Sequence, residues 1–157
     1  MRKRIIGPGP GEVPAAEPGW LDLDLLAQVE ITSEDAGYPI ESALIPGTGL
    51  GWRAAQPGEQ LIRLLFDEPL RLQRLRLVFH EAEQERTQEF VLRWSPDRGQ
   101  SYREILRQQY NFSPPAVTRE VEDYDTDLDG VTALELEIVP DISGGSARAS
   151  LAQLRLA

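Results

Sequence analysis

The chain has 157 residues, the usual length of one domain, and at this size about two-thirds of the unfolded surface can be buried. Its formal net charge of -10 argues against a sequence-independent nucleic-acid binder, which needs a basic face, and against adsorption on an anionic membrane. Cysteine is absent, which excludes thiolate nucleophiles, zinc–thiolate sites and disulfides.

The first 18 residues are rich in proline and glycine and show no periodicity. This composition predicts a flexible N-terminal arm, followed by a single domain over residues 19–157. Only Ile5 and Ile6 separate the basic start from the Pro/Gly run, whereas a secretory segment needs about 7–15 apolar residues. No stretch of about 20 apolar residues occurs. We therefore expect a cytoplasmic protein with no membrane insertion.

The domain begins with alternating leucines and aspartates over residues 21–25, which predict a half-buried strand continuing through residues 28–31. A loop-like stretch with several Gly and Pro turns follows over residues 32–60, and a loop of this length is often functional. Residues 61–66 predict the next strand, which we expect to end at Asp67-Glu68-Pro69.

Residues 70–94 hold two alternating apolar runs, 75–79 and 90–94, separated by a polar segment without Gly or Pro. We interpret the runs as adjacent core strands and the segment between them as a loop at one end of the sheet. That loop carries His80, the only histidine of the chain.

The remaining chain predicts further strands over residues 101–108, 117–124 and 134–138, with a hairpin turn over residues 95–99 and a loop over residues 109–115. Three leucines close the chain, and no segment shows a helical period. About eight short strands with Gly/Pro turns predict an all-β protein, an antiparallel jelly-roll β-sandwich.

Several short motifs in a fixed order resemble the discoidin-like (coagulation factor type C) domain and the bacterial galactose-binding-like carbohydrate-binding modules of that superfamily. They run from residue 21 to residue 156 and comprise Ser33-Glu34, Tyr38-Pro39, Ala43-Leu44, Thr48, Gly51-Trp52, Pro69, Arg86, Phe90, Ser95, Asp97, Gly99 and Tyr102. The resemblance implies a jelly-roll sandwich whose loops at one end bind a ligand, usually a sugar, without catalysis.

The resemblance also implies a structural Ca²⁺ beneath the loop that leads to Trp52. The family places Asp-Gly-Asp after Ala-Leu and a Glu near the C-terminus, but here Ile45-Pro46-Gly47 and Gln153 stand at those positions. Both changes remove negative charge that a divalent ion needs. We therefore expect no required cofactor and no tight metal site, with a weak structural calcium site as the alternative.

A second acidic stretch, residues 125–130, matches the first half of a calcium loop, D-x-D-x-D-G. The twelfth position is Leu136 instead of the required Glu, so an acidic turn between strands is the favoured interpretation. The glycine-rich residues 47–51 lack the following helix that a phosphate-binding loop needs, and we expect a plain loop there.

Candidate ligand-binding residues come from three places in the sequence. The loop containing His80, Glu83 and Arg86 matches the region that supplies sugar-contacting side chains in the family, although a surface histidine beside acids is often without function. Tyr110, Asn111 and Phe112 form an expected aromatic loop tip, where a ring can stack on a sugar or plug the core. Arg53 is the third candidate.

The favoured function is therefore a non-catalytic module that binds carbohydrate through these loops. The alternative is a protein–protein interaction or assembly module that uses the same loops, and the two differ in whether the site is a solvated platform or a flat apolar patch. A small hydrolase is the third hypothesis, but no carboxylate pair or activated serine is marked out by the sequence. We expect no catalytic residues.

Overall fold

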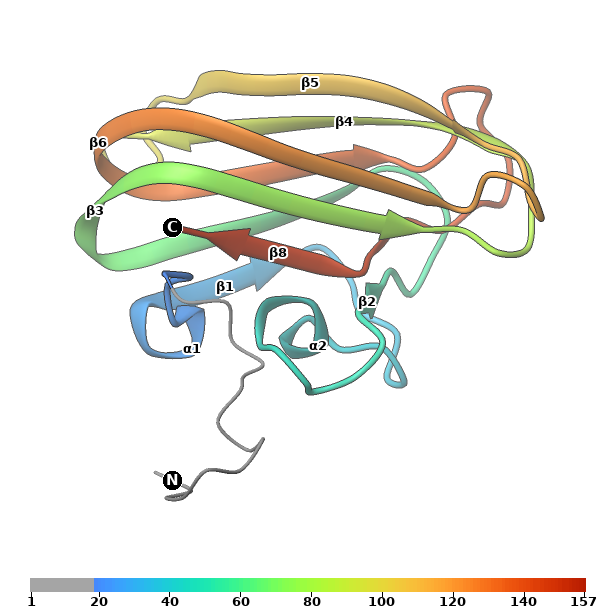
Figure 1. Ribbon diagram of the computed structural model, residues 1–157, viewed down its shortest axis with the longest axis horizontal. Helices are drawn as coiled ribbons and strands as arrows, with labels where there is room; N and C mark the ends of the chain where they lie inside the picture. The colour runs from blue at the N-terminus through green and yellow to red at the C-terminus, as the bar shows by residue number, and fades with distance from the viewer. Residues whose placement is uncertain (1–18) are drawn as a thin grey trace, which may run out of the picture.

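The structure is a computed structural model that describes residues 19–157, so the predicted arm over residues 1–18 lies outside the described residues. Within the described range the chain forms eight strands and two one-turn helices (Figure 1). In chain order these are α1 (Leu23–Leu26), β1 (Ala27–Ile31), α2 (Glu41–Leu44), β2 (Trp52–Arg53), β3 (Gln60–His80), β4 (Arg86–Ser95), β5 (Arg103–Phe112), β6 (Arg119–Val139), β7 (Ser150–Leu151) and β8 (Gln153–Leu156). The all-β prediction is confirmed.

Two long strands, β3 and β6, bend and take part in both layers of a β-sandwich (Figure 1). The first part of β3 pairs with β1 and with the second part of β6, which continues to β4 and then β5. The second part of β3 pairs with β8 and with the first part of β6. All these pairs are antiparallel, so the predicted antiparallel sandwich is confirmed.

The core lies between the layers. Contacts in it show that one prediction about strand order is wrong. The rings of Phe79 on β3 and Phe90 on β4 pack with centroids 5.1 Å apart, yet β3 and β4 are not hydrogen-bonded neighbours. The two strands that were predicted to be adjacent therefore face each other across the sandwich. Alternation reports which side of a strand is buried, and it does not report the partner strand.

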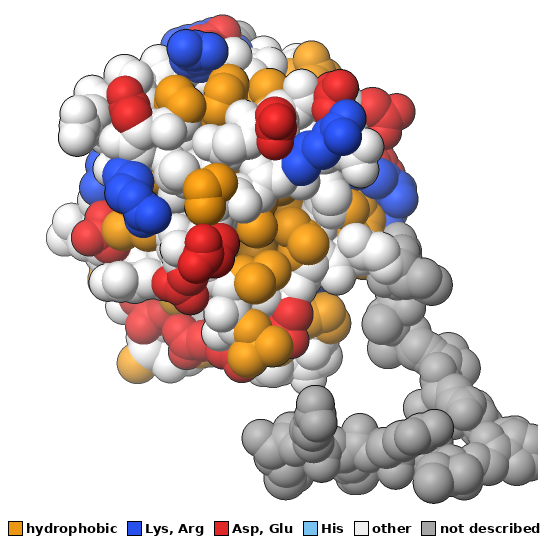
Figure 2. Space-filling view, turned by 90° about the vertical axis from the view of Figure 1, so that its left-hand side faces the viewer, with side chains coloured by type: hydrophobic (Ala, Val, Ile, Leu, Met, Phe, Trp, Pro, Cys, Tyr) orange, Lys and Arg blue, Asp and Glu red, His pale blue; other side chains and the backbone are white. Residues whose placement is uncertain are grey.

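Two further predictions are wrong at the bends of β3 and β6. Asp67-Glu68-Pro69 does not end a strand, because it lies within β3 where the register to β6 shifts between Leu65 and Leu70. A proline without an N–H group fits such an irregular position. Residues 125–130 likewise lie within β6 and form neither a turn nor a calcium loop. Figure 2 faces this bent end, where a group of hydrophobic side chains is bordered by acidic and basic ones.

The strand predicted at residues 21–25 is also wrong, because Leu23–Leu26 form the helical turn α1. The side chain of Asp22 caps this turn by accepting a hydrogen bond from the Asp24 N–H, and such local capping competes with a strand. The predicted loop over residues 32–60 holds α2 and β2. No helix within residues 19–157 is long and apolar enough to cross a membrane.

Candidate functional site

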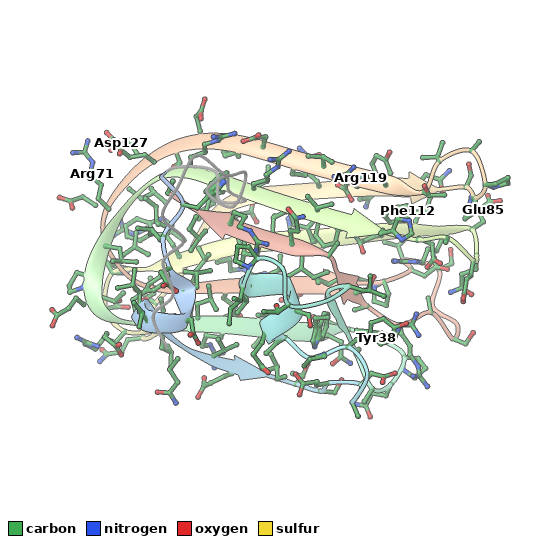
Figure 3. All side chains as sticks on the ribbon, turned by 60° about the horizontal axis from the view of Figure 1, so that its bottom comes forward. Tyr38, Arg71, Glu85, Phe112, Arg119 and Asp127 are labelled. Carbon is green, nitrogen blue, oxygen red and sulfur yellow. The ribbon has the colours of Figure 1, made fainter. Side chains whose placement is uncertain are left out.

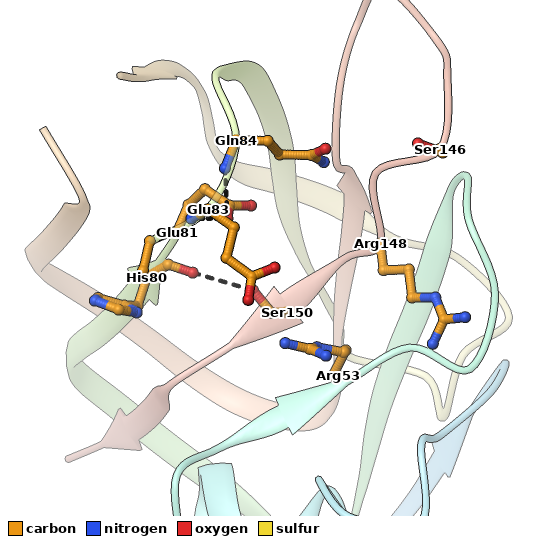
Figure 4. Close-up of a pocket in the computed structure, with 9 residues that line it drawn as sticks. Arg53, His80, Glu81, Glu83, Gln84, Ser146, Arg148 and Ser150 are labelled. Carbon is orange, nitrogen blue, oxygen red and sulfur yellow. Dashed lines mark hydrogen bonds between the residues drawn. The ribbon is translucent and has the colours of Figure 1, made fainter. Parts of the chain in front are cut away.

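A hollow of about 310 Å³ lies at the end of the sandwich opposite the bends of β3 and β6, where the β3–β4 loop meets β2 and the segment that leads into β7 (Figure 4). In Figure 3, Tyr38, Glu85 and Arg119 lie toward this end, whereas Arg71 and Asp127 lie at the opposite end. We call this hollow the loop-end groove. It is lined by Arg53, His80, Glu81, Ala82, Glu83, Gln84, Ser146, Arg148 and Ser150.

Arg53 is positioned in the groove by its strand and by an aromatic ring. Trp52, which is 1% exposed, anchors β2 by donating its indole N–H to the Ser33 carbonyl at 3.0 Å. The Arg53 guanidinium lies 4.5 Å from the centre of the Tyr38 ring, a cation–π contact that holds it in place. Trp52 therefore belongs to the core.

Gly51 allows β2 to approach β7. Its φ is +107°, and an added Cβ atom would lie 2.5 Å from the Leu151 carbonyl oxygen. Only glycine fits such a backbone position without strain. The register that places Arg53 opposite Ser150 therefore depends on this glycine.

The β3–β4 loop is held by Glu81. One of its carboxylate oxygens accepts the backbone N–H groups of Glu83 at 2.9 Å and Gln84 at 3.3 Å, and the other accepts the Arg86 Nε–H at 2.6 Å. Burial opposes ionisation of Glu81, but these hydrogen bonds outweigh it and lower the pKa of its carboxyl group. The loop is therefore shaped by an ionised carboxylate.

Arg86, predicted to bind ligand, is 2% exposed and does not line the groove. Its Nη1 donates to the Pro140 carbonyl at 2.8 Å and to the Gln88 side chain at 3.2 Å, and its guanidinium lies 4.8 Å from the centre of the Phe112 ring. Arg86 thus supports the β3–β4 loop from inside the sandwich through Glu81. Sequence reasoning had no signal that this arginine points inward.

The aromatic candidates also lie elsewhere. Tyr110, Asn111 and Phe112 are the last residues of β5, so the predicted loop tip is wrong. Phe112 is fully buried and packs against Tyr110 at 5.0 Å between ring centres, while the Tyr110 hydroxyl donates to the Arg119 carbonyl at 2.8 Å. Asn111 is exposed, and its side-chain oxygen accepts from Thr87. The structure therefore brings Arg53, His80 and Glu83 together and separates the other four candidates from them.

A second hollow, of about 600 Å³, adjoins the loop-end groove and shares Arg53, His80 and Ser150 with it. Its other walls are largely apolar and include Leu50, a residue that is 84% exposed. The remaining lining residues are Tyr38, Trp52, Val78, Thr118, Arg119, Leu151, Ala152 and Gln153. The two hollows together form a longer depression with one polar and one more apolar half.

A buried acid lies between the layers and was missed by the sequence analysis. Glu120 on β6 is 2% exposed and accepts a hydrogen bond from Gln88 on β4 at 3.2 Å. Burial, together with a hydrogen bond and the charge of Glu122, raises the pKa of Glu120 to about 8. Glu120 is consequently protonated at neutral pH. The alternation of β6 placed it on one face, but only packing shows that this face is buried.

The position where the resemblance implies calcium does not fit a divalent ion. Arg155 donates from Nη1 to the Ala43 carbonyl at 2.7 Å, so a cationic side chain already uses this oxygen. Arg76 and Arg155 both line the adjacent hollow of about 500 Å³ together with Gln153. Within residues 19–157 no group of three His, Asp or Glu side chains could hold a metal ion. A guanidinium on the Ala43 carbonyl and a second arginine in the adjacent hollow oppose the binding of Ca²⁺.

We predict that the melting temperature is the same with millimolar calcium and with EDTA, as measured by differential scanning calorimetry. Replacing Arg155 with methionine is expected to lower the melting temperature, because the Ala43 carbonyl loses its charged donor. Ligand binding at 100 times Kd stabilises a fold by about 2.7 kcal/mol. A calcium-dependent rise in melting temperature that corresponds to a stabilisation of that size would contradict the prediction.

Comparisons with known proteins show the fold. No protein-family model matches the sequence, and a comparison with curated protein sequences finds no match. Among solved structures, a family 32 carbohydrate-binding module (CBM32) of AlyQ in complex with 4,5-unsaturated mannuronic acid is 14% identical, with a TM-score of 0.60 over 84% of this chain and 95% of that chain. The family 32 module from C. perfringens NanJ in complex with galactose is 10% identical, with a TM-score of 0.61 over 87% and 96%.

A third similar structure is a CBM32 domain from Clostridium perfringens in complex with GalNAc-beta-1,3-galactose. It is 15% identical, with a TM-score of 0.61 over 88% of this chain and 99% of that chain. The chain therefore has the discoidin-like β-sandwich fold of these modules over nearly their whole length, and the resemblance noted in the sequence is confirmed at the level of the fold.

Proposed function

We propose that this protein is a non-catalytic carbohydrate-binding module whose loop-end groove binds a sugar. The observation that carries the proposal is the convergence of Arg53, His80 and Glu83 in one hollow at an end of the sandwich. Guanidinium and imidazole donors beside a carboxylate acceptor match sugar hydroxyls, which donate and accept hydrogen bonds. The sugar ligands named for the three similar structures add support.

The polarity of the groove favours a sugar over a protein partner. Eight of its nine lining residues are polar, and Ala82 is the exception. A protein interface usually has an apolar centre with a polar rim, which this groove does not provide. Small polar ligands are held by a few convergent polar groups in a concave site.

The carboxylates near the groove favour binding over hydrolysis. A glycosidase needs an acid with a raised pKa beside a second carboxylate at the scissile bond. Glu81 is ionised and engaged by Arg86, and the acid with the raised pKa, Glu120, is buried where no substrate reaches it. Neither of these two acids is therefore placed to donate a proton to a glycosidic oxygen bound in the groove.

A sugar titration followed by amide NMR tests the proposal. A panel of mono- and disaccharides is added to the isotopically labelled chain. Saturable shifts are expected at Arg53, residues 80–84 and residues 146–150, and not at Asn111 on the outer face of β5. Replacing His80 with alanine is expected to weaken binding about tenfold, because it removes one hydrogen-bonding group from the shared centre of the two hollows.

The control variant is Asn111→Ala, which changes an exposed side chain outside the groove. It is expected to bind sugars like the natural chain. Shifts confined to residues around Asn111 at the end of β5 would place the binding site outside the groove. Loss of binding in Asn111→Ala but not in His80→Ala would do the same. Absence of shifts with every sugar would overturn the proposal.

A further inference from the structure

The charge distribution around the loop-end groove points to the class of sugar. We infer that the ligand carries an acidic group, a carboxylate or a sulfate ester, that lies against Arg53 and Arg148. This inference rests on the proposed function and specifies the chemistry of the ligand.

The charge of the groove differs from the charge of the whole chain. The chain has a formal net charge of -10. Yet the two joined hollows are lined by three arginines, Arg53, Arg119 and Arg148. The acidic residues that line the hollows are Glu81 and Glu83. Among the described residues Glu81 is already engaged by Arg86 at 2.6 Å, whereas Glu83 has no ion pair. The depression is therefore locally cationic on an acidic protein, which attracts an anion.

The arginines of the groove are less engaged with carboxylates than six other arginines of the fold. Six described arginines have a carboxylate oxygen within 3.2 Å: Arg63, Arg71, Arg74, Arg86, Arg93 and Arg107. Among the described residues, Arg53 has no carboxylate within ion-pair distance, and Arg148 forms an ion pair with Asp35 at the longer distance of 3.7 Å. The guanidinium groups that face the groove thus keep donors for a ligand.

Arg53 is held in a fixed position in the groove. Arg53 is half-buried, its guanidinium is stacked on Tyr38, and its strand is fixed by pairing with β7. A positioned guanidinium loses little freedom when it forms two parallel hydrogen bonds to an acidic group. Arg148, whose side chain is 44% exposed, can add a second cation at the same wall.

The two walls of the groove carry different chemical groups. In Figure 4, Arg53 and Arg148 come from β2 and the segment before β7, whereas Glu83 and Gln84 come from the β3–β4 loop. The arginine wall suits an acidic group, and the opposite wall suits hydroxyls. Hollows of about 310 and 600 Å³ that share three residues suit an acidic saccharide of more than one ring.

Calorimetric titration with matched sugars tests this inference. The probes are oligosaccharides of galacturonic, glucuronic and mannuronic acid, the neutral galactose, glucose and mannose oligosaccharides of the same length, and a sulfated galactose oligosaccharide. We expect one acidic series to bind at least tenfold more tightly than its neutral counterpart, with the preference shrinking as salt rises from 50 to 500 mM. The uronate and sulfate arms identify which acidic group is bound.

Substitutions assign the preference to the arginine wall. Arg53→Gln is expected to weaken the acidic ligand about tenfold and the neutral one less than threefold, and Arg53→Lys is expected to recover part of the loss. Arg148→Gln is expected to act in the same direction with a smaller effect. Arg107→Gln, an exposed arginine on β5, is the control and leaves both affinities unchanged. Amide spectra of each variant verify that it is folded.

The outcomes separate this inference from the proposed function. Equal affinity for acidic and neutral sugars, with shifts in the groove, would overturn the inference and leave the proposed function standing. An acidic preference that survives both Arg53→Gln and Arg148→Gln would also overturn it. Absence of binding to every sugar in the panel would overturn both.

Discussion

Replacing Arg86 with methionine is expected to lower the free energy of unfolding by about 3–5 kcal/mol, because it removes one partner of a buried ion pair. The loss leaves the carboxylate of Glu81 and the carbonyl of Pro140 without their charged donor. Methionine fills much of the same volume, so the effect arises mainly from the unpaired polar groups. Urea denaturation followed by tryptophan fluorescence measures the change.

The matched control is Arg107→Met on β5, where both ion pairs are partly exposed. Such pairs contribute about 0–1 kcal/mol, so this variant is expected to unfold close to the natural chain. Arg86→Lys tests geometry, because an ammonium group cannot reproduce the contacts to Glu81, Gln88 and Pro140 together. An Arg86→Met variant as stable as Arg107→Met would contradict the structural role of Arg86.

The same substitution is expected to affect the groove. Glu81 shapes the β3–β4 loop only while its carboxylate stays ionised and in place. Without Arg86 the pKa of Glu81 is expected to rise, since the side-chain hydrogen bond and the charge that lower it are lost. Amide resonances of residues 81–84 are therefore expected to broaden or shift in Arg86→Met.

The free energy of unfolding is expected to fall as the pH rises from about 4.5 to about 8, because the folded chain holds a proton on Glu120 that the unfolded chain releases. The pKa of this carboxyl group is raised from 4.5 to about 8, so its contribution to stability is complete below pH 4.5 and is lost as the pH rises to about 8. The slope between these values is at most about 1.4 kcal/mol per pH unit.

Glu120→Gln isolates this effect, because glutamine keeps the shape of the protonated acid and does not titrate. Urea denaturation at pH 5, 6, 7 and 8 is expected to show the variant gaining on the natural chain at each step. Glu85→Gln, a change at an exposed acid of the β3–β4 loop, is expected to follow the natural chain. Parallel stability curves for the natural chain and Glu120→Gln would show that Glu120 does not titrate in this range.

The outline of the fold could be predicted because its signals are local. The turn at residues 95–99 was found from its residue types, and the structure shows Asp97 accepting from Ser95 and Ser101 with Gly99 at φ +88°. The burial of alternate residues in β3 and β4 was likewise evident, because successive side chains of a strand point to opposite faces. The polar segment after β3, together with the family resemblance, predicted His80 and Glu83 as ligand-binding residues, and with Arg53 they stay a prediction.

Three of the four candidates that lie outside the groove do so because of contacts that are not local in the sequence. Arg86 and Phe112 lie opposite each other on neighbouring strands, and both side chains face inward. The Arg86 guanidinium therefore stacks on the Phe112 ring and does not face the groove. Tyr110 uses its hydroxyl on the Arg119 carbonyl, nine residues away in sequence. No spacing in the sequence records these contacts.

The sequence by itself determined the all-β class, the sandwich, the loop at the end of β3 and the lack of acidic ligands for calcium, since each follows from local periodicity, turn residues or charge. Tertiary structure alone decided that β3 and β4 lie in opposite layers, that Glu120 is buried and that Arg148 joins Arg53 beside His80. The physical reason is that burial, pKa and ion pairing depend on which distant segments meet. In this fold β3 and β6 belong to both layers, so their bends determine which distant segments meet.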